Sequence, residues 1–551
     1  MSERFSRRTF LKGSALAAGA GLAWTYGGSL AFGQIGIDQI PFESRESMPL
    51  LEEGAEPGLA LRRPLGDGIY NAAPRLVFDR AGKLHAVYIN ETDGAESVCL
   101  RGFSGENWES EQILNEGETS AVHPDLCAHA DGIAVAWSAK TSPDETAIHV
   151  ATIDASGAAR TQSIGAAARG MSQLAGLHYH PAIASDGEGL WVAWESRVLQ
   201  TEDRDQQSPF DIAIARIDAS GGLSNVHFLG EGRGDRLRPR LAAAAAGVWL
   251  VYDEADRQGG STVYLRKLTP SAISRGNFDD PIAVTVHPAF DHAPDLAVDS
   301  KQRVWVGWHS NRRSLDEWDI PRWFHLRRYD PRTQSWSEPQ TEPPGKNLEK
   351  TGTDQSFEFV RLAVAPDDSV LVTGRPSHNF CLQMLGGFGW SELRRLPRDG
   401  WGGRGQYMSA AFDPQGHLWV LRRDLWGNVL HKITGLPNSM ADAPLKRVTI
   451  DALGKTPAVV SNIQRRHQPW EPLEDLEGID QPLNFYYGDL HGHTWTSDGM
   501  GDVDEYYRIR REYYEDDFAS LTDHDTFVGQ SILPTEFEYI NDMTAHYNET
   551  G

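Results

Sequence analysis

The chain has 551 residues, of which 77 are acidic and 52 are Lys or Arg, so its formal net charge at pH 7 is −25. Because nucleic-acid binding depends on Lys and Arg side chains that neutralise phosphates, this charge excludes a nucleic acid as the main partner. It still permits a small anionic substrate, such as a phosphate ester held by metal ions. The 54 Gly, 30 Pro and 17 Trp residues are typical of a β-rich chain with many turns.

Residues 1–33 have the pattern of an export signal. The paired Arg7 and Arg8 precede an apolar run of small residues that extends from Gly13 to about Gly33. This order resembles a twin-arginine signal, which implies that the twin-arginine machinery exports the protein to the periplasm or beyond. A basic N-terminal anchor is the alternative. Because the run is interrupted and rich in Ala and Gly, and no later apolar stretch is long enough, we expect no permanent membrane span.

One pattern recurs seven times between residues 50 and 440, with copies mostly 50 to 60 residues apart. Each copy has alternating apolar residues, an Asp/Gly turn and a second apolar run that usually ends in an aromatic residue. The copies begin at Pro74, Pro124, Pro181, Pro239, Pro294, Arg361 and Ala411. Asp and Gly favour the tight turn, and the period-2 apolar residues favour the two strands.

The remainder of each period has room for two more strands, and four strands per period resemble a β-propeller. The copies must stack around an axis, because one such sheet cannot bury both of its faces. We therefore predict a mostly β fold with a propeller over residues 50–440. Our count is seven blades, while six or eight remain open because the copies near residues 361 and 411 are degenerate. The turn at Asp186 faintly resembles the Asp-box of sialidases, but no copy matches it in full and we assign no sialidase chemistry.

Several copies carry a polar residue next to the first Pro, at His123, His180, Arg238 and, two residues ahead, His292. Equivalent positions on successive blades form a ring near one mouth of a propeller. A ring of cationic groups could hold an anionic ligand. The alternative is that each residue makes a repeated packing contact with a neighbouring blade, and repeated positions usually reflect repeated packing.

The composition changes after the repeats. Residues 441–482 are polar, contain several prolines and have no clean periodicity, so we expect a linker between domains. From residue 483 onward the chain carries metal-ligand residue types. A strand is predicted up to Leu490, and His491 and His493 are two residues apart, so on a strand they point to the same side. Two imidazoles presented together make half of a metal site.

The next residues complete a predicted βαβ unit. Asp498 lies in a Ser-Asp-Gly turn, where its carboxylate can fold back toward the same metal. A helix is expected with Asp502 as its N-cap, Glu505 in a capping box and an apolar stripe at Val503, Tyr506, Ile509 and Tyr513. Residues 517–521 predict a second buried strand that ends before His524. His and Asp side chains then lie at the carboxyl ends of both strands, where α/β barrels place their sites.

These motifs carry a family resemblance. Asp489-Leu490-His491-Gly492-His493, then Ser497-Asp498-Gly499, then Leu521-Thr522-Asp523-His524-Asp525 resemble the first two motifs of the PHP (polymerase and histidinol phosphatase) superfamily. The resemblance covers residues 483–551 and implies the start of a distorted β/α barrel that hydrolyses phosphate esters with two or three divalent metal ions (Zn, Mn or Fe). It implies His491, His493, Asp498 and His524 as metal ligands, and Asp489, Asp523 and Asp525 as residues that orient the imidazoles. A set of buried structural histidines is the alternative.

The implied chemistry needs no side-chain nucleophile. Metal ions neutralise the phosphate and lower the pKa of a bound water, so that hydroxide becomes available near neutral pH. We therefore assign no catalytic side chain and expect a small-molecule or glycan-type anion as the substrate. The sequence contains no P-loop and no dinucleotide fingerprint, so no organic cofactor is expected.

The sequence also departs from the family. A PHP barrel needs a Glu and further His or Asp ligands on later strands, whereas the last residue, Gly551, is only 27 positions after His524. We therefore expect a fragment or a remnant that is inactive by itself. Two functions stay open: an exported metal-dependent hydrolase of the phosphoesterase type with a propeller recognition domain, and a secreted propeller binding protein with a vestigial PHP segment.

Overall fold

The computed structural model describes residues 51–549 apart from 53, 55–56, 66–70, 118–119, 166–174, 199–208, 231–233, 246, 256–259, 287–289, 311–321, 345–356, 376–379, 398–407, 425–426, 440, 451–485, 498, 515, 525 and 528–529. The predicted export signal, most of the predicted linker, Asp498 and Asp525 lie outside the described residues. Residues 46–551 form one compact unit. No helix in the described part of the chain is both long and apolar enough to span a membrane.

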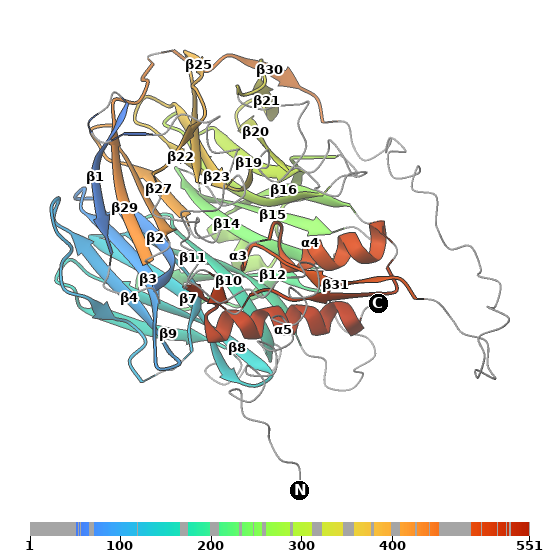
Figure 1. The fold of residues 1–551 in the computed structure, drawn as a ribbon. Helices are drawn as coiled ribbons and strands as arrows, with labels where there is room; N and C mark the ends of the chain where they lie inside the picture. Colours follow the sequence, from blue (N-terminus) through green and yellow to red (C-terminus); the bar gives the residue numbers. More distant parts are fainter. Residues whose placement is uncertain are drawn as a thin grey trace, which may run out of the picture. The chain divides into compact units, whose positions relative to one another are not determined.

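Seven antiparallel sheets follow one another in chain order around a common axis (Figure 1). The innermost strands are β2 (Asn71–Phe78), β6 (Val122–His129), β10 (Gly176–Ser185), β14 (Arg236–Ala244), β18 (Asp291–Val298), β22 (Glu358–Val364) and β27 (Met408–Phe412). Each contacts the innermost strands of both neighbours, including β27 with β2, so the ring is closed. The predicted propeller and its count of seven blades are confirmed, and the degenerate copies near residues 361 and 411 are blades like the others.

The outer strands complete the four-stranded blades. The second strands are β3 (Leu84–Thr92), β7 (Gly132–Ser142), β11 (Gly189–Val198), β15 (Gly247–Ala255), β19 (Val304–Ser310), β23 (Val370–Arg375) and β28 (Leu418–Asp424). The third strands are β4 (Ala95–Phe103), β8 (Glu145–Ile153), β12 (Asp211–Asp218), β16 (Ser261–Leu268), β20 (Trp323–Asp330), β24 (Cys381–Gly386) and β29 (Gly427–Thr434). The fourth strands of the first six blades are β5 (Gln112–Ile113), β9 (Ala159–Ile164), β13 (His227–Phe228), β17 (Ile282–Ala283), β21 (Ser335–Pro339) and β25 (Gly389–Trp390).

The last blade is closed by the beginning of the fold. Strand β1 (Gly58–Pro64) pairs antiparallel with β29 and supplies the fourth strand of the seventh blade. Two further pieces lie at sheet edges: β26 (Arg394–Arg395) pairs with β24, and β30 (Leu445–Val448) pairs with β21 of the fifth blade. The first part of the predicted linker is therefore an edge strand and not a free connection. A short helix, α3 (Pro270–Arg275), follows β16.

The apolar faces of neighbouring blades bury one another. Seven hydrophobic clusters each join two adjacent blades, and together they go once around the ring. The cluster between the first and second blades also includes residues of other blades and of the C-terminal segment. Between the second and third blades, for example, Val150 and Val192 are fully buried in the same cluster. This packing is what the period-2 pattern of the repeats requires, because each sheet needs a neighbour on both faces.

The Asp of the repeated turn has two functions. Asp186 accepts the Gly189 N–H with one carboxylate oxygen (2.8 Å) and the indole N–H of Trp191 with the other (2.7 Å). Asp299 and Asp413 bind the tryptophan six residues ahead in the same way, at 3.3 and 3.0 Å. One carboxylate thus closes the turn and fixes the aromatic residue of the following strand, which explains why the two recur together in the sequence.

Six of the seven innermost strands contain a β-bulge at equivalent positions. At each bulge one residue has a positive φ between 46° and 55°: Ala73, His123, His180, Arg238, Ala293 and Phe359. The first five directly precede the Pro that begins each copy. A bulge bends the strand and re-aims its side chains. The ring expected at one mouth of the propeller therefore exists, although its fifth member is Ala293 and His292 lies one residue before it.

The C-terminal residues form the predicted βαβ unit, but its second strand is not buried as predicted, because Phe518 is exposed and Leu521 is half-buried. Strand β31 (Gly488–Gly492) pairs in parallel with β32 (Phe518–Leu521), and α4 (Val503–Arg508) lies between them in the chain. Asp502 is the N-cap, and its carboxylate accepts the Val503 N–H at 2.7 Å. The helix continues as a π-helical turn, η6 (Ile509–Tyr513), where a regular α-helix was expected. Strands β33 (Thr526–Phe527) and β34 (Gln530–Ser531) and helix α5 (Pro534–Glu549) follow, and no further barrel strand occurs among the described residues.

The Asp–Trp pair of the turns should contribute measurably to stability. In Asp186→Asn an amide N–H faces the indole N–H of Trp191 or the turn N–H groups, and the ion pair with Arg216 (3.0 Å) is lost. We expect a loss of about 1–3 kcal/mol in the free energy of unfolding, measured by urea denaturation at pH 7. Although burial raises the pKa of Asp186, hydrogen bonds from Trp191 and Arg216 hold it below its usual value. The difference between the two proteins should therefore shrink as the pH falls below about 3.9.

Asp218→Asn is the matched control, because Asp218 closes a similar turn with Ser220 and Gly222 as its hydrogen-bonded partners (2.8 and 2.9 Å). The loss in the free energy of unfolding should be clearly smaller in Asp218→Asn than in Asp186→Asn. Equal losses in the two variants would show that the indole hydrogen bond contributes nothing beyond the turn.

Candidate functional site

Three histidine rings meet at the carboxyl ends of the two parallel strands. His491 is in β31, His493 follows that strand, and His524 is three residues beyond β32. The ring centres of His491 and His493 are 4.5 Å apart, and those of His493 and His524 are 4.6 Å apart. His491 and His524 are exposed and His493 is half-buried. Pairing of β31 with β32 therefore brings together three of the four predicted ligands, although His524 is 33 positions after His491 in the sequence.

A threonine that sequence reasoning did not single out holds the first ring. The hydroxyl of Thr522 is 2.9 Å from Nδ1 of His491 and donates to the carbonyl of Gly492 at 3.3 Å. With Nδ1 engaged in this way, Nε2 of His491 is the nitrogen left for a ligand. Thr522 belongs to the second quoted motif, so its place before His524 was a signal that could have been used.

The aspartates near the histidines bind backbone and other side chains. Asp489 accepts the His491 N–H (3.1 Å) and the Tyr506 hydroxyl (3.1 Å), and it forms an ion pair with Arg510. Asp523 accepts the Thr494 N–H at 2.7 Å and the Ser497 hydroxyl at 2.5 Å. The two carboxylates thus fix the segments that carry the histidines.

The ring positions can be compared with those of a metal site. Imidazoles that share one cation, with bonds of about 2.0–2.1 Å, have ring centres about 5 Å apart. The two observed separations fit this arrangement, and imidazole is a good ligand for Zn or Fe. Among the described residues, however, no group of three His, Cys, Asp or Glu side chains has the geometry of a metal site. The carboxylate expected to complete the set, Asp498, is outside those residues.

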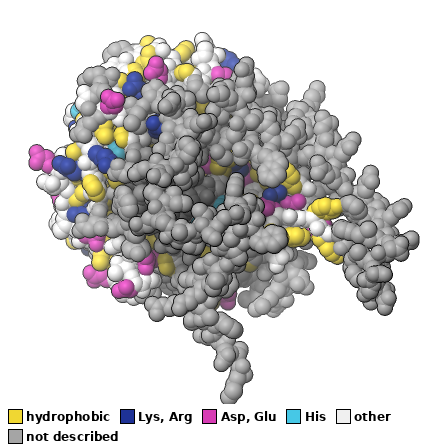
Figure 2. Space-filling view, in the orientation of Figure 1, with side chains coloured by type: hydrophobic (Ala, Val, Ile, Leu, Met, Phe, Trp, Pro, Cys, Tyr) yellow, Lys and Arg dark blue, Asp and Glu magenta, His cyan; other side chains and the backbone are white. Residues whose placement is uncertain are grey.

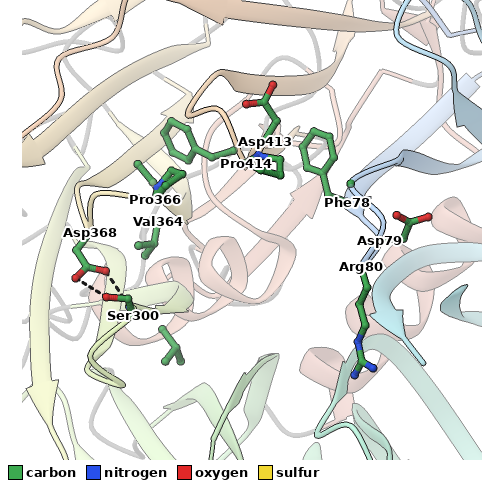
Figure 3. Close-up of a pocket in the computed structure, with 13 residues that line it drawn as sticks. Phe78, Asp79, Arg80, Ser300, Val364, Pro366, Asp368, Asp413 and Pro414 are labelled. Atoms are coloured by element: carbon green, nitrogen blue, oxygen red, sulfur yellow. Dashed lines mark hydrogen bonds between the residues drawn. The ribbon is translucent and has the colours of Figure 1, made fainter. Parts of the chain in front are cut away.

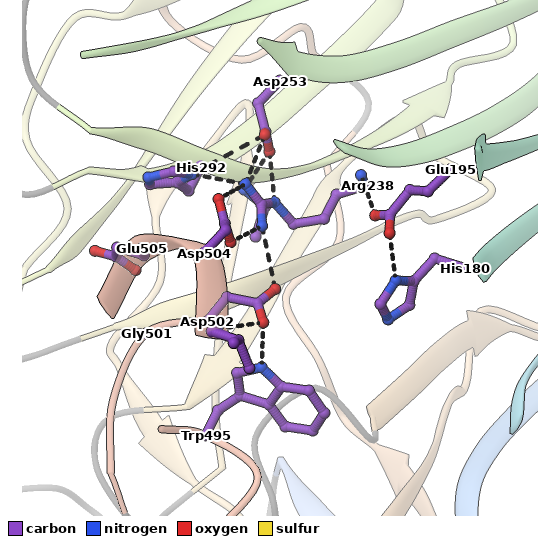
Figure 4. Close-up of polar contacts among 12 residues, drawn as sticks. His180, Glu195, Arg238, Asp253, His292, Trp495, Gly501, Asp502, Asp504 and Glu505 are labelled. Carbon is purple, nitrogen blue, oxygen red and sulfur yellow. Dashed lines mark hydrogen bonds and ion pairs between the residues drawn. The ribbon is translucent and has the colours of Figure 1, made fainter. Parts of the chain in front are cut away.

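A buried arginine of the propeller anchors the start of α4. Arg238 comes from the bulge of β14, and its guanidinium forms ion pairs with Asp502 (3.1 Å), Asp504 (2.5 Å) and Asp253 (2.6 Å), as Figure 4 shows. It also contacts Nδ1 of His292 at 2.8 Å. Burial alone would raise the pKa of Asp504, but Arg238 holds it below its usual value. The N-terminus of α4 is therefore fixed to the fourth blade by charge.

A second set of contacts fixes the residues around this helix start. The Glu505 carboxylate accepts from Nε of Arg322 at 2.8 Å, and the Glu358 carboxylate accepts the Gly501 N–H at 3.0 Å. The predicted capping box is therefore wrong, because Glu505 reaches the propeller and not the backbone of its own helix. Although burial acts in the opposite direction, Arg322 holds the pKa of Glu505 well below its usual value.

Helix α5 contacts four blades. At its start, the Thr535 N–H donates to the Glu96 carboxylate at 2.8 Å. Near its end, Nε2 of His546 lies 2.9 Å from the Asp235 carboxylate. Between them, Tyr539 packs edge-on against His123 and His180, with ring centres 5.3 and 4.9 Å away. Apolar residues of α4 and α5 complete this contact in one cluster with residues of β6, β10 and β14.

The residues at the propeller mouth thus bind the C-terminal segment of the same chain, which neither hypothesis from the sequence expected. His123 and His180 stack on each other (3.6 Å between centres) under Tyr539, and Arg238 binds two acidic residues. The anionic groups that Arg238 meets are those of the chain itself. The hypothesis of contacts with a neighbouring blade is confirmed in part, because His123 of the second blade stacks on His180 of the third. His180 itself pairs with Glu195 of its own blade at 2.9 Å.

Loss of the Arg238 guanidinium should release the C-terminal segment. Arg238→Met leaves Asp253, Asp502 and Asp504 buried without their cation, which typically costs about 3–5 kcal/mol. We expect faster amide hydrogen exchange over residues 503–513, measured by mass spectrometry.

Arg236→Met is the matched control, since Arg236 is two residues away on the same strand and pairs with Asp211 and Glu254 of the propeller, each at 2.9 Å. Any faster amide hydrogen exchange in Arg236→Met should be confined to the third and fourth blades. Unchanged exchange over residues 503–513 in Arg238→Met would contradict the anchoring function.

Charges on the described surface are mixed. On the face in Figure 2, the described Lys and Arg side chains lie among Asp and Glu side chains and form no continuous basic area. This distribution agrees with the acidic composition, and it offers no polyanion-binding surface on the described part of that face.

No family model and no curated protein sequence matches the chain. Similar solved structures include the GH93 α-L-arabinofuranosidase of Fusarium graminearum in complex with arabinobiose, at 12% identity over 56% of this chain and 90% of that chain, with a TM-score of 0.37. They also include a subtype N11 neuraminidase-like protein of A/flat-faced bat/Peru (10% identity, 59% and 91% covered, TM-score 0.36). A third is a mutant of Trypanosoma rangeli sialidase displaying trans-sialidase activity (11% identity, 70% and 60% covered, TM-score 0.39). At these identities and TM-scores the likeness does not extend to site residues or substrates.

Proposed function

We propose that the chain is part of an exported metal-dependent hydrolase of the phosphoesterase type, with His491, His493, His524 and Asp498 as metal ligands. The observation that supports this most is the convergence of three imidazoles at the ends of two parallel strands, with centres 4.5 and 4.6 Å apart. The resemblance of the same segment to PHP motifs points to the same residues. Two of the three rings are exposed, so a substrate can reach them.

A divalent cation bound by these residues would activate water and neutralise phosphate charge. The chain's own residues keep the ligands in place. Thr522 holds the His491 ring through Nδ1, and Asp523 organises the turn that leads to Asp498. The Arg510 guanidinium, which pairs with Asp489 of β31, fixes the strand that carries His491. Such supporting contacts commonly change metal affinity by about 10–100-fold.

In this proposal the propeller is the platform for the metal-binding segment. The ion pairs of Arg238 and Arg322 fix the first turn of α4, and the helix connects the two strands that present the histidines. We also propose export by the twin-arginine route on the basis of Arg7, Arg8 and the small-residue run that follows. That route carries folded proteins, which suits a protein that acquires its metal before export.

The decisive variant is His493→Ala, because His493 is the middle ring and contacts both of the others. Metal content is measured by elemental analysis of the full-length protein after loading with Zn, Mn or Fe and dialysis. We expect bound metal in the wild type and at least about a 100-fold loss of affinity in the variant. Hydrolysis of bis(p-nitrophenyl) phosphate, followed in parallel, should fall with the metal.

His129→Ala is the control. This half-buried histidine is the last residue of β6 in the second blade, and its Nδ1 lies 2.9 Å from the Ser185 hydroxyl. It is far in sequence from the histidine cluster. It should retain both metal and activity. A full-length protein that takes up no metal, hydrolyses no phosphodiester and is unaffected by His493→Ala would contradict the proposed function.

A further inference from the structure

The channel of the propeller contains a charged cavity of about 350 Å³. Its charged lining residues are one per blade and stand at equivalent positions, two residues after the positive-φ residue of each bulge. They are Arg75, Asp125, Arg240, Asp295 and Arg361. Ala182 and Ser409 occupy the corresponding places in the third and seventh blades. Three cations therefore face two carboxylates, so the formal charge of the ring is +1.

Both carboxylates are partly engaged in joining blades. Asp125 accepts the Ile183 N–H of the next blade at 3.0 Å, and Asp295 accepts the Leu362 N–H of the next blade at 2.8 Å. In each case one oxygen, Oδ2, is used. Asp125 Oδ1 lies 3.9 Å from Nε of Arg75, which is too long for a hydrogen bond. The carboxylates therefore do not fully compensate the arginines.

Arg240 and Arg361 have no carboxylate partner within 4 Å among the described residues. Arg361 is 9% exposed, its Nη1 donates to the Val360 carbonyl at 2.9 Å, and its buried Nε lacks a hydrogen-bond acceptor in the described structure. Burial and the neighbouring Arg240 lower the pKa of Arg75 to about 10, and they also lower the pKa of Arg361 well below its usual value. A buried donor without an acceptor is costly, so an anion that accepts from these cations would stabilise the site.

A second pocket lies at the turns of the blades. It measures about 370 Å³ and is lined by the turns after β2, β18, β22 and β27, as Figure 3 shows. Along β2, Val77 lines the inner cavity and the next residue, Phe78, lines the outer pocket. Along β27, Ala410 lines the inner cavity and Phe412 lines the outer pocket. The outer pocket therefore lies next to the inner cavity along these strands.

We propose that the channel cavity binds a small hydroxy-carboxylate, of the size of one sugar acid, with its carboxylate at Arg240 and Arg361 and its hydroxyl groups at Asp125 and Asp295. A guanidinium binds a carboxylate through two parallel hydrogen bonds, and a monoanion balances the formal charge of the ring. The volume is near the lower end of the range of about 300–1,000 Å³ that ligand pockets occupy, so the site suits one unit and not a polymer. The proposal is independent of the metal site.

The test is calorimetric titration of the full chain with D-gluconate, with sorbitol and inorganic phosphate as comparison ligands. We expect gluconate to bind with a Kd below about 1 mM, sorbitol to show no binding, and phosphate to bind at least about tenfold more weakly. Arg361→Met should weaken gluconate binding by about tenfold or more. Because this variant removes a buried cation without a carboxylate partner, its melting temperature without ligand should not fall, which separates lost binding from lost folding.

Arg332→Met is the matched control, since Arg332 is exposed and pairs with Asp330 at 3.1 Å outside the channel. It should bind gluconate like the wild type. The proposal is overturned if gluconate binds no better than sorbitol, if phosphate binds as tightly as gluconate, or if Arg361→Met leaves the affinity unchanged.

Discussion

The buried guanidinium of Arg238 is the contact on which the arrangement of this protein most depends. It joins Asp253 of the propeller to Asp502 and Asp504 at the start of α4. Taking such groups out of water is costly, so a buried ion pair is weak evidence for extra stability. What it does determine is position, because a misplaced helix would leave several charges buried without partners. The first turn of α4 therefore has one permitted place on the propeller, and the histidine-bearing strands on either side of that helix follow it.

The same repeated position serves different purposes around the ring. The bulge supplies an arginine for ion pairing in the fourth blade, stacked imidazoles in the second and third blades, and Phe359 against Trp495 in the sixth, with ring centres 5.9 Å apart. Two residues further along, the side chains line the channel and not the mouth. A single backbone device, repeated six times, thus separates a contact surface for the C-terminal segment from a charged interior.

The features that sequence could predict are those that depend on local pattern. The Asp186 turn, its Trp191 partner and the alternating apolar residues are within one repeat, so the strands, the turns and the blade count followed from spacing. The histidine cluster could also be predicted, because His491, His493 and His524 all lie at the ends of two strands in a short βαβ unit. Asp502 was recognised as an N-cap for the same reason.

Contacts between distant segments were not accessible in this way. Arg238 and Asp504 are 266 residues apart, and nothing local distinguishes Asp504 from a solvent-exposed acidic residue in the first turn of a helix. Glu505 shows the limit most clearly, since the spacing typical of a capping box is present while the side chain binds Arg322. The channel charges follow a repeat position, but Arg75 and Arg361 converge only when the ring closes. Their proximity depends on the closed ring of blades and cannot be read from any single repeat.

X-ray absorption spectroscopy at the metal edge of the loaded full-length protein tests the central claim most directly. Three imidazole ligands should give nitrogen and oxygen scatterers at about 2.0–2.1 Å for zinc, together with the outer-shell scattering that imidazole rings produce. The account predicts this outer-shell signal at the strength of about three rings. A spectrum with oxygen scatterers alone, and no imidazole signal, would contradict it, because the metal would then be bound somewhere other than at His491, His493 and His524.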